Sequence, residues 1–231
     1  MKNIILNAIL PIKGHSERVP NKNIREFAGK PLYQHIAQTL QASKYVKSIV
    51  IDTDSNFIAN QAQNTFSKVC IIHRPQHMQG DLISMNDIIN HDISISQGDH
   101  FLQTHCTNPL LSQSTLEQAI QTYFENLDQY GSLFSVTKLQ TRLYWASGRP
   151  INHDPLKLER TQDLPPVYEE NSNFYIFSRS SFINAGNNRI GLNPQMFEVD
   201  ALESVDIDEE SDFQLAEAIY KLKSTSGSEE P

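Results

Sequence analysis

Short apolar runs of strand length alternate with amphipathic runs of helix length along most of this chain. The first apolar run, residues 3–10, is rich in branched residues and ends at Pro11, as expected of a strand buried on both faces of a parallel sheet. The alternation predicts further strands at 47–54, 69–74, 100–106, 132–138 and 173–179, and helices at 31–43, 55–66, 84–95, 114–127 and 211–222. A capping box of Ser114 and Glu117 is expected to open the fourth helix. Strands separated by such helices join through right-handed crossovers, which predicts a three-layer α/β fold with a mostly parallel sheet.

The alternation breaks at residues 139–170, which are rich in proline and aromatic residues and show no clean period. So long a segment without regular structure is uncommon inside a compact domain. We therefore interpret it as an inserted arm or small dimerisation lobe within one domain of residues 1–222. Tyr144 and Trp145 are most simply packing or interface residues of this arm. The polar end, residues 223–231, is predicted to be a disordered tail.

Composition excludes several classes of protein. The chain has 231 residues, a formal net charge of −8 and no apolar run near the roughly 20 residues of a membrane span. The acidic total argues against general binding of nucleic acid, and no cleavage site follows the first apolar run, so a signal peptide is not expected. Cys70 and Cys106 lie in apolar runs and are expected to be buried free thiols, which fits a reducing cytoplasm. His73 and His77 flank Pro75, which argues against a helical zinc pair.

Residues 10–30 form a basic loop in this acidic chain. Its cations are Lys13, Arg18, Lys22, Arg25 and Lys30. The loop could be a solvated surface turn, but it follows a buried strand and precedes a helix, where backbone N–H groups favour anions. It matches neither a Walker motif nor a dinucleotide fingerprint, because Gly14 and Gly29 are far apart. We interpret it as a polyphosphate site built mainly from side chains.

The acidic stretch VDIDEESD contains Asp206 and Asp208. It could be an acidic turn before the last helix, with Ser211 or Asp212 as the N-cap. It could also supply carboxylates to a hard divalent cation such as Mg²⁺.

Several motifs occur in the order typical of the sugar cytidylyltransferases, which include the CMP-sialic acid synthetases and, more distantly, the CMP-Kdo synthetases. They are the basic loop with its GKPL end, DTD at 52–54, Arg74-Pro75 followed by GDLISMND, LQTHCTNPLL, RTQDLPPVYEENSNFYIF and ESVDIDEESDFQLAE. The chain therefore resembles this family over most of its length, to about residue 220. Lys13 stands where the family usually has arginine.

The resemblance implies a Rossmann-like nucleotidyltransferase that moves CMP from CTP to the hydroxyl of an acidic sugar, with Mg²⁺ and release of pyrophosphate. The implied nucleotide-binding residues are Lys13, Gly14, Ser16, Arg18, Lys22, Asn23, Arg74 and Ser84. The implied catalytic residues are Lys13, Lys22 and Asp208, with Asp208 as the first choice of metal ligand and Asp206 as the second. The implied sugar-binding residues are Gln103, Arg160, Gln162 and Asn171. Arg25 and Lys30 are read as structural or surface cations, Ser84 could instead cap a helix, and Gln103 could be a buried amide.

The chain departs from the CMP-sialic acid synthetases at two arginines. Glu169 and Glu170 stand where those enzymes have an arginine before P-N-G, and Leu111 replaces the arginine of S-P-L-R. The acceptor could therefore be a sialic-acid-like sugar, another 2-keto-3-deoxy acid, or a neutral or phosphorylated sugar. A nucleotide-binding relative without activity is the remaining alternative. Because family members are commonly homodimers in which an arm borders the other subunit's site, we expect a cytoplasmic homodimer whose small-molecule partners are CTP and the sugar.

Overall fold

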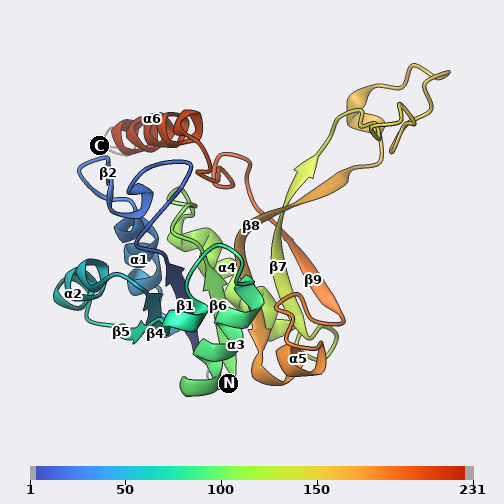
Figure 1. Cartoon of the computed structure of the whole chain (residues 1–231). Coiled ribbons are helices and arrows are strands. Elements are labelled where there is room, and N and C mark those ends of the chain that lie inside the picture. Colours follow the sequence, from blue (N-terminus) through green and yellow to red (C-terminus); the bar gives the residue numbers. More distant parts are fainter. Residues whose placement is uncertain (1–3, 227–231) are drawn as a thin grey trace.

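The computed structural model describes residues 4–226, which form a seven-stranded sheet covered by helices on both faces (Figure 1). The strands are β1 (Leu6–Ile12), β4 (Val46–Thr53), β5 (Val69–His73), β6 (His100–Thr104), β7 (Ser132–Leu139), β8 (Val167–Ser178) and β9 (Pro194–Glu198). Their order is β5-β4-β1-β6-β8-β7-β9. β8 runs antiparallel to β6 and β7, and the other pairs are parallel. The predicted α/β fold with a mostly parallel sheet is confirmed.

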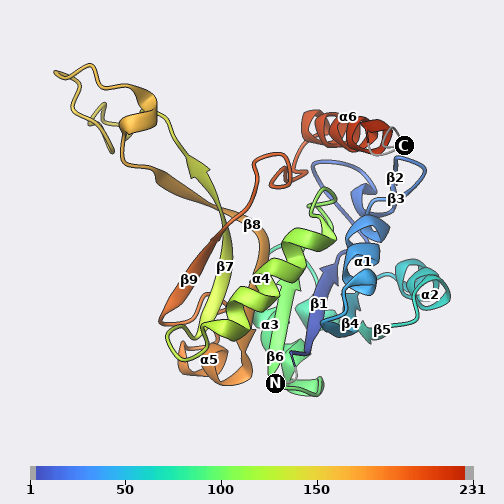
Figure 2. The same cartoon turned by 180° about the vertical axis from the view of Figure 1, so that it is seen from behind.

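The helices divide between the two faces of the sheet and one of its edges (Figure 2). One face is covered by α1 (Tyr33–Ala42), α2 (Asn56–Thr65) and α4 (Gln113–Glu125), and the other by α3 (Met85–Ile95) and α5 (Arg179–Asn184). Helix α6 (Glu210–Ser226) packs against the two-residue strands β2 (Glu26–Phe27) and β3 (Lys30–Pro31), near the edge where the parallel strands end. Three short 3₁₀ helices span Lys22–Ile24, Gln76–Met78 and Thr161–Asp163.

Strand β1 is buried along its whole length, because helices pack on both of its faces. Leu10 and Ile12 join the core under α1, α2 and α4, whereas Ile9 joins the core under α3 and α5. The strand does not end at Pro11 as predicted but continues to Ile12. Proline fits there because β6 pairs with β1 only from Asn7 to Ile9, so the sheet needs ladder bonds on one side alone at Pro11.

The segment 140–166 between β7 and β8 extends from the body as an arm (Figure 1). Its core is a small hairpin, in which the Trp145 N–H donates to the Arg149 carbonyl at 2.8 Å and Tyr144 bridges to Pro150. Strand β8 starts at Val167, well before the predicted residue 173, because it stays paired with β7 as far as Leu139, at the base of the arm.

Several predicted element boundaries were wrong. Helix α4 is capped by Ser112, which accepts the Thr115 N–H, whereas Glu117 accepts the Lys44 N–H instead of closing a capping box. Helix α1 begins at Tyr33, because Pro31 pairs with β2. Helix α5 and strand β9 were not predicted, since one is very short and the other is a half-exposed edge strand containing proline. Helix α6 continues to Ser226, so residues 223–226 of the expected tail are helical, and 227–231 lie outside the described residues.

Both cysteines are free, as predicted, but only Cys106 is buried. Cys70 is exposed because β5 is an edge strand with little cover. Between residues 4 and 226, no helix combines the length and apolar character needed to cross a lipid bilayer.

Candidate active site

Three segments that are distant in sequence meet at the edge where the parallel strands end. They are the loop after β1, the loop after β6, and the extended stretch before α6. The first two, together with Asp81 and Met85 from the segment that leads into α3, line a cleft of about 380 Å³. Its lining residues are Pro11, Lys13, His15, Ser16, Glu17, Arg18, Lys22, Asn23, Asp81, Met85, His105, Cys106 and Thr107. The carboxyl ends of parallel strands are the usual ligand site of such sheets.

Lys22 ties the basic loop to the acidic stretch. Its side chain is buried, with 8 % of the residue exposed, and its ammonium donates to the Ile207 carbonyl at 2.5 Å. Ile207 in turn donates its N–H to the Thr107 carbonyl at 2.9 Å. Because Ile207 lies between Asp206 and Asp208, these two bonds hold both carboxylates beside the cleft.

Asn23 fixes the path of the basic loop through two side-chain hydrogen bonds. Its amide donates to the Lys13 carbonyl at 2.7 Å, and its side-chain oxygen accepts from the Cys106 thiol at 3.1 Å. Burial raises the pKa of Cys106 to about 12, so this thiol is a hydrogen-bond donor and not a nucleophile. In this chain Asn23 therefore shapes the loop, and its side chain is engaged on both sides.

The two outer cations of the cleft are paired with acidic residues at its rim. Lys13 contacts Asp81 at 2.6 Å and Arg18 contacts Asp208 at 2.6 Å. The hydrogen bond from Lys13 holds the pKa of Asp81 below its ordinary value. Exposed ion pairs of this kind contribute little stability. An incoming polyphosphate can therefore displace the carboxylates and take their place on Lys13 and Arg18.

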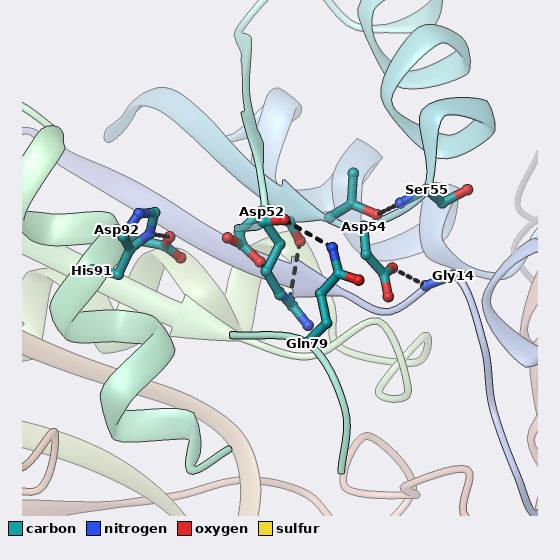
Figure 3. A network of polar contacts seen from close by, with 9 residues as sticks. Gly14, Asp52, Asp54, Ser55, Gln79, His91 and Asp92 are labelled. Carbon is teal, nitrogen blue, oxygen red and sulfur yellow. Dashed lines mark hydrogen bonds and ion pairs between the residues drawn. The ribbon is translucent and has the colours of Figure 1, made fainter. Parts of the chain in front are cut away.

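Gly14 lies at a close approach between the basic loop and the DTD motif. Its N–H donates to the Asp54 carboxylate at 2.6 Å, a bond visible in Figure 3. A side-chain carbon at this position would come within 2.9 Å of the Ser55 Cβ. The position needs glycine for space, and the DTD motif supplies the acceptor that anchors the start of the loop.

Asp206 is a carboxylate with unused hydrogen-bonding capacity. Its Oδ1 is buried and has no hydrogen-bond partner among the residues that the structure describes. Burial raises the pKa of Asp206, and the charge of Asp208 raises it further, while Thr107, Lys22 and Arg18 oppose the shift. A buried carboxylate oxygen beside a second carboxylate favours a bound cation. The alternative of a simple helix cap is wrong in its residues: α6 starts at Glu210, and Asp212 accepts the N–H groups of Asp208 and Glu209.

Arg74 and Ser84 lie outside the lining of this cleft. Arg74 is buried and its guanidinium is bonded to Asp52, with 1 % of each side chain exposed. Ser84 caps helix α3: its hydroxyl accepts the Asp87 N–H and donates to the Asp87 carboxylate at 2.7 Å. Of the two predictions for Ser84, the helix cap agrees with its contacts.

Asp52, His91 and Asp92 bring ligand atoms within 4.8 Å of one another. The guanidinium of Arg74 already supplies positive charge to Asp52 there. Burial, followed by the charge of Asp52, raises the pKa of Asp92 to about 9, so Asp92 is protonated at neutral pH. The cluster is thus neutralised by one proton and one arginine, which argues against a metal at this place.

Gln103 and Asn171 are both buried and both bonded. Gln103 donates to the His105 ring at 3.0 Å and accepts from Arg189 at 2.7 Å. Asn171 donates to the hydroxyls of Thr137 and Ser204 at 3.0 and 3.1 Å. Gln103 thus reaches the cleft through His105, whereas Asn171 supports the turn that leads to the acidic stretch.

Arg160 and Gln162 lie in the arm, away from the cleft of their own chain (Figure 1). Arg160 pairs with its neighbour Asp163 through two bonds of 2.7 and 3.1 Å. Within one chain the structure therefore does not bring these two residues to the other predicted site residues.

The residues of the site and its surroundings that were not predicted include Asp81, His105, Thr107 and Arg189. The first three are contained in motifs that the sequence displays, GDLISMND and LQTHCTNPLL, but their side chains were not singled out. Arg25 and Lys30 lie outside the cleft lining, and Arg25 pairs with Glu210 of α6.

Comparison with known proteins agrees with this geometry. The chain is 26% identical over 238 residues to a pseudaminic acid cytidylyltransferase of Campylobacter jejuni, covering 96% of this chain and 97% of the relative. It is 25% identical over 225 residues to a CMP-N,N'-diacetyllegionaminic acid synthase of Legionella pneumophila, covering 93% of this chain and 96% of the relative. A CMP:2-keto-3-deoxy-manno-octonic acid synthetase solved with CTP has the same fold, with a TM-score of 0.72 at 15% identity over 95% of this chain and 99% of that one. The sequence model of the family described as "Cytidylyltransferase" matches residues 7–229, and the chain belongs to this family.

Proposed function

We propose that this chain transfers CMP from CTP to a hydroxyl of a sialic-acid-like 2-keto-3-deoxy sugar and releases pyrophosphate. One observation supports the proposal most directly. The cleft holds Lys13, Arg18 and Lys22 within contact of the stretch that carries Asp206 and Asp208. Cations and carboxylates together at a strand edge suit a nucleoside triphosphate and its metal ion.

In this proposal the residues of the cleft have different roles in the transfer of CMP. The sugar hydroxyl attacks the α-phosphorus while the bond to the leaving pyrophosphate breaks. Lys13 and Arg18, at the outer rim, neutralise oxygens of the triphosphate, and Ser16 donates a hydrogen bond. Lys22 lies deeper and is held by the Ile207 carbonyl, so its charge stays fixed as negative charge develops on the leaving group. Lys13 serves where the family usually has arginine, since a lysine binds phosphate as a point charge.

The acidic stretch fits a divalent cation. The buried, unbonded Oδ1 of Asp206 and the nearby carboxylate of Asp208 are hard oxygen donors of the kind that Mg²⁺ prefers. A bound Mg²⁺ would polarise phosphate oxygens and lower the pKa of the attacking hydroxyl. We propose Asp206 rather than Asp208 as the first ligand, because Asp208 is engaged by Arg18. Binding of a phosphate to Arg18 would free Asp208 to become the second.

Sugar acids are the substrate class that we propose. The curated relatives carry the names of acids: pseudaminic acid, diacetyllegionaminic acid, N-acylneuraminate and 3-deoxy-manno-octulosonate. Gln103 is buried beside the cleft and bonded to His105, which lines it. Gln103 is therefore suited to orient His105 toward a bound sugar.

We further propose a cytoplasmic homodimer in which the arm of one subunit borders the cleft of the other. The arm holds Arg160 and Gln162, which cannot serve the cleft of their own chain where they stand. It also exposes large apolar side chains, including Leu156 at 93 % and Leu158 at 97 %. Exposed apolar residues on a projecting segment are typical of interfaces. Two free thiols fit a reducing compartment.

The test is release of pyrophosphate from CTP and Mg²⁺ with a panel of acceptors. The panel contains pseudaminic, legionaminic and N-acetylneuraminic acids, 3-deoxy-manno-octulosonate, a neutral sugar and a sugar phosphate. Release with at least one acid, and none with the neutral or phosphorylated sugars, is expected. A thermal shift with CTP but no release with any acceptor would instead identify a nucleotide-binding relative without activity. Release only with the sugar phosphate would refute the proposed substrate class.

A further inference from the structure

We propose that Arg189 binds the carboxylate of the acceptor sugar and thereby makes this cleft selective for sugar acids. The inference rests on the proposed function and adds a specificity-determining residue to it. Arg189 lies in the loop between α5 and β9, outside every motif that relates the chain to its family.

The position of Arg189 is fixed by contacts on two sides. Its backbone N–H donates to the Asn86 side chain at 3.4 Å, next to Met85, which lines the cleft. Its guanidinium Nη1 donates to the Gln103 Oε1 at 2.7 Å. The side chain therefore stands beside the end of β6, next to the residues that border the nucleotide cleft.

Gln103 and His105 connect Arg189 to the cleft through hydrogen bonds. The amide of Gln103 donates to the His105 Nε2 at 3.0 Å. Burial, followed by the charges of Arg189 and Lys22, lowers the pKa of His105 to about 3, so the ring is neutral and this nitrogen accepts. Since Gln103 accepts from Arg189 and donates to His105, its orientation is set, and Arg189 lies one amide away from the cleft wall.

Arg189 carries a positive charge that the described residues leave without an ion pair. It is half-buried, its guanidinium lies 3.8 Å from the centre of the Tyr175 ring, and burial lowers its pKa. None of the ion pairs within 4.0 Å among residues 4–226 includes it. The nearby Glu170 is instead bonded to the Tyr175 hydroxyl. The direct contacts of this half-buried guanidinium are neutral, and the charge of Glu170 only partly offsets the cost of its burial, so it can bind a planar carboxylate well.

Arg189 also accounts for a departure in the sequence. Glu170 and Leu111 stand where CMP-sialic acid synthetases have arginines, which removes positive charge from the site. Arg189 returns one positive charge from a different loop. Its place on the Tyr175 ring, with Glu170 behind that ring's hydroxyl, keeps the guanidinium plane oriented.

The experiment compares Arg189→Gln with wild type on the most active sugar acid of the panel and on the methyl ester of that acid. Kinetics of pyrophosphate release give KM for sugar and for CTP separately. We expect Arg189→Gln to raise the KM for the acid by about 10- to 100-fold, as for loss of a charge-assisted hydrogen bond. The KM for CTP should stay within about twofold, and the poor activity of the ester should be the same in both proteins.

Arg179→Gln is the matched control. Arg179 also lies over an aromatic ring, Phe101 at 5.1 Å, but it donates to the Ser96 and Gly98 carbonyls at the opposite edge of the sheet. This variant should lose stability without a change in the KM for the acid. If Arg189→Gln fails to fold, Arg189→Lys replaces it, with an expected increase of about tenfold because the forked geometry is lost.

The outcomes separate this inference from the proposed function. Absence of turnover in the wild type with every acid refutes the proposed function and, with it, this inference. Normal wild-type turnover with an unchanged KM for the acid in Arg189→Gln refutes the inference alone. An equal rise of both KM values, or an equal loss on the ester, also refutes it, because a merely structural role would act in that way.

Discussion

At the scale of single residues, charge in this molecule is arranged by burial. The exposed cations of the cleft are paired with exposed carboxylates, whereas the buried groups are held by backbone carbonyls, amides or one another. The buried Oδ1 of Asp206 has no hydrogen-bond partner among the described residues, and neither do the Oδ2 atoms of Asp52 and Asp92. Asp52 is paired with Arg74 through its other oxygen and Asp92 is protonated, whereas Asp206 lies beside a second carboxylate, so we expect Asp206 to matter most for the reaction.

Asp206→Asn should therefore lower kcat by roughly 100-fold and raise the Mg²⁺ concentration needed for half-maximal activity, because one hard oxygen ligand is lost. Asp81→Asn is the comparison, since Asp81 is an exposed rim carboxylate that pairs with Lys13. We expect less than a tenfold effect there. Titration with Mg²⁺ during pyrophosphate release measures both. An Asp206→Asn variant with wild-type dependence on Mg²⁺ would exclude it as the ligand.

Asp92 predicts how stability depends on pH. Its pKa is about 9 in the folded protein, mainly because it is buried and next to Asp52, and about 4 in an unfolded chain. The folded state thus binds a proton that the unfolded state releases between these values, so this group's contribution falls as pH rises from about 4 to about 9. Asp92→Asn should flatten that slope and gain stability relative to wild type at pH 8.

Urea unfolding at pH 5, 6.5 and 8 measures the effect. Asp99→Asn is the control, because Asp99 is exposed on the loop that follows α3. It should shift all three midpoints equally or not at all. Parallel slopes for wild type and Asp92→Asn would mean that Asp92 is already ionised in the folded protein.

Sequence reasoning identified single residues best where a motif and its position agreed. Lys13, Ser16, Arg18, Lys22 and Asn23 all line one cleft, as expected for a loop that follows a buried strand. It could not identify Arg189, because the contact with Gln103 spans 86 positions and depends on how two loops pack. The burial of Arg74 was not predictable for a similar reason, because its partner Asp52 lies on a neighbouring strand, and its role toward the nucleotide stays a prediction.

At the scale of elements, strand β8 contains the main irregularity of the sheet. Phe134 pairs with Tyr175 but Val136 pairs with Glu170, so β8 carries extra residues between these two positions. Ser172 lies within this bulge in the left-handed region, with φ of 57°. The bulge turns Asn171 toward the segment before the acidic stretch, where it bonds to Ser204.

Ser172→Val should destabilise the protein by about 1–2 kcal/mol relative to Ser172→Gly, because a branched side chain is strained in the left-handed region. Both variants lose the contact between the Ser172 hydroxyl and the Tyr175 hydroxyl at 3.2 Å, so their difference isolates the backbone. Urea denaturation gives the two free energies of unfolding. Equal values would show that the bulge relaxes to another conformation.

Elements with a strong period were predictable, and elements set by their neighbours were not. Strand β4 and helices α2 and α3 lie close to their predicted bounds, since each buries a clear apolar face. Strand β5 also lies close to its predicted bounds, although its apolar residues Val69 and Ile71 are only partly buried against the core. Strand β9 exists only because β7 offers it an edge, and its own five residues are mostly half-exposed. The bulge in β8 likewise depends on a partner strand, so the sequence did not predict it, and the predicted strand began only at residue 173.

At the scale of the whole molecule, the arm and the body have different requirements. The body has a continuous core, whereas the arm leaves Leu156 and Leu158 almost fully exposed. In the proposed homodimer a second subunit would cover these two side chains.

Leu158→Asp should therefore weaken self-association and activity while leaving the thermal unfolding of the body nearly unchanged, because Leu158 is outside the core. Phe57→Asp is the control, since Phe57 is an exposed apolar residue of α2, at the opposite end of the body from the arm. It should remain dimeric. Analytical ultracentrifugation measures both. A wild-type protein that sediments as an active monomer would contradict the proposed role of the arm.

Helix α6, the last element of the described chain, packs against the end of the basic loop, near the start of the chain. Arg25 bonds to Glu210 and lies 4.1 Å from the centre of the Phe213 ring, and the Ala28 N–H donates to Glu217 at 2.9 Å. Lys22 and its acceptor on Ile207 are 185 positions apart. At about 5–20 residues per second of synthesis, the basic loop waits about 10–40 s on the ribosome before its acidic partner is made. During that interval Arg18, Lys22 and Arg25 lack their partners on the acidic stretch and α6, so this side of the cleft can form only after nearly all of the described chain has been made.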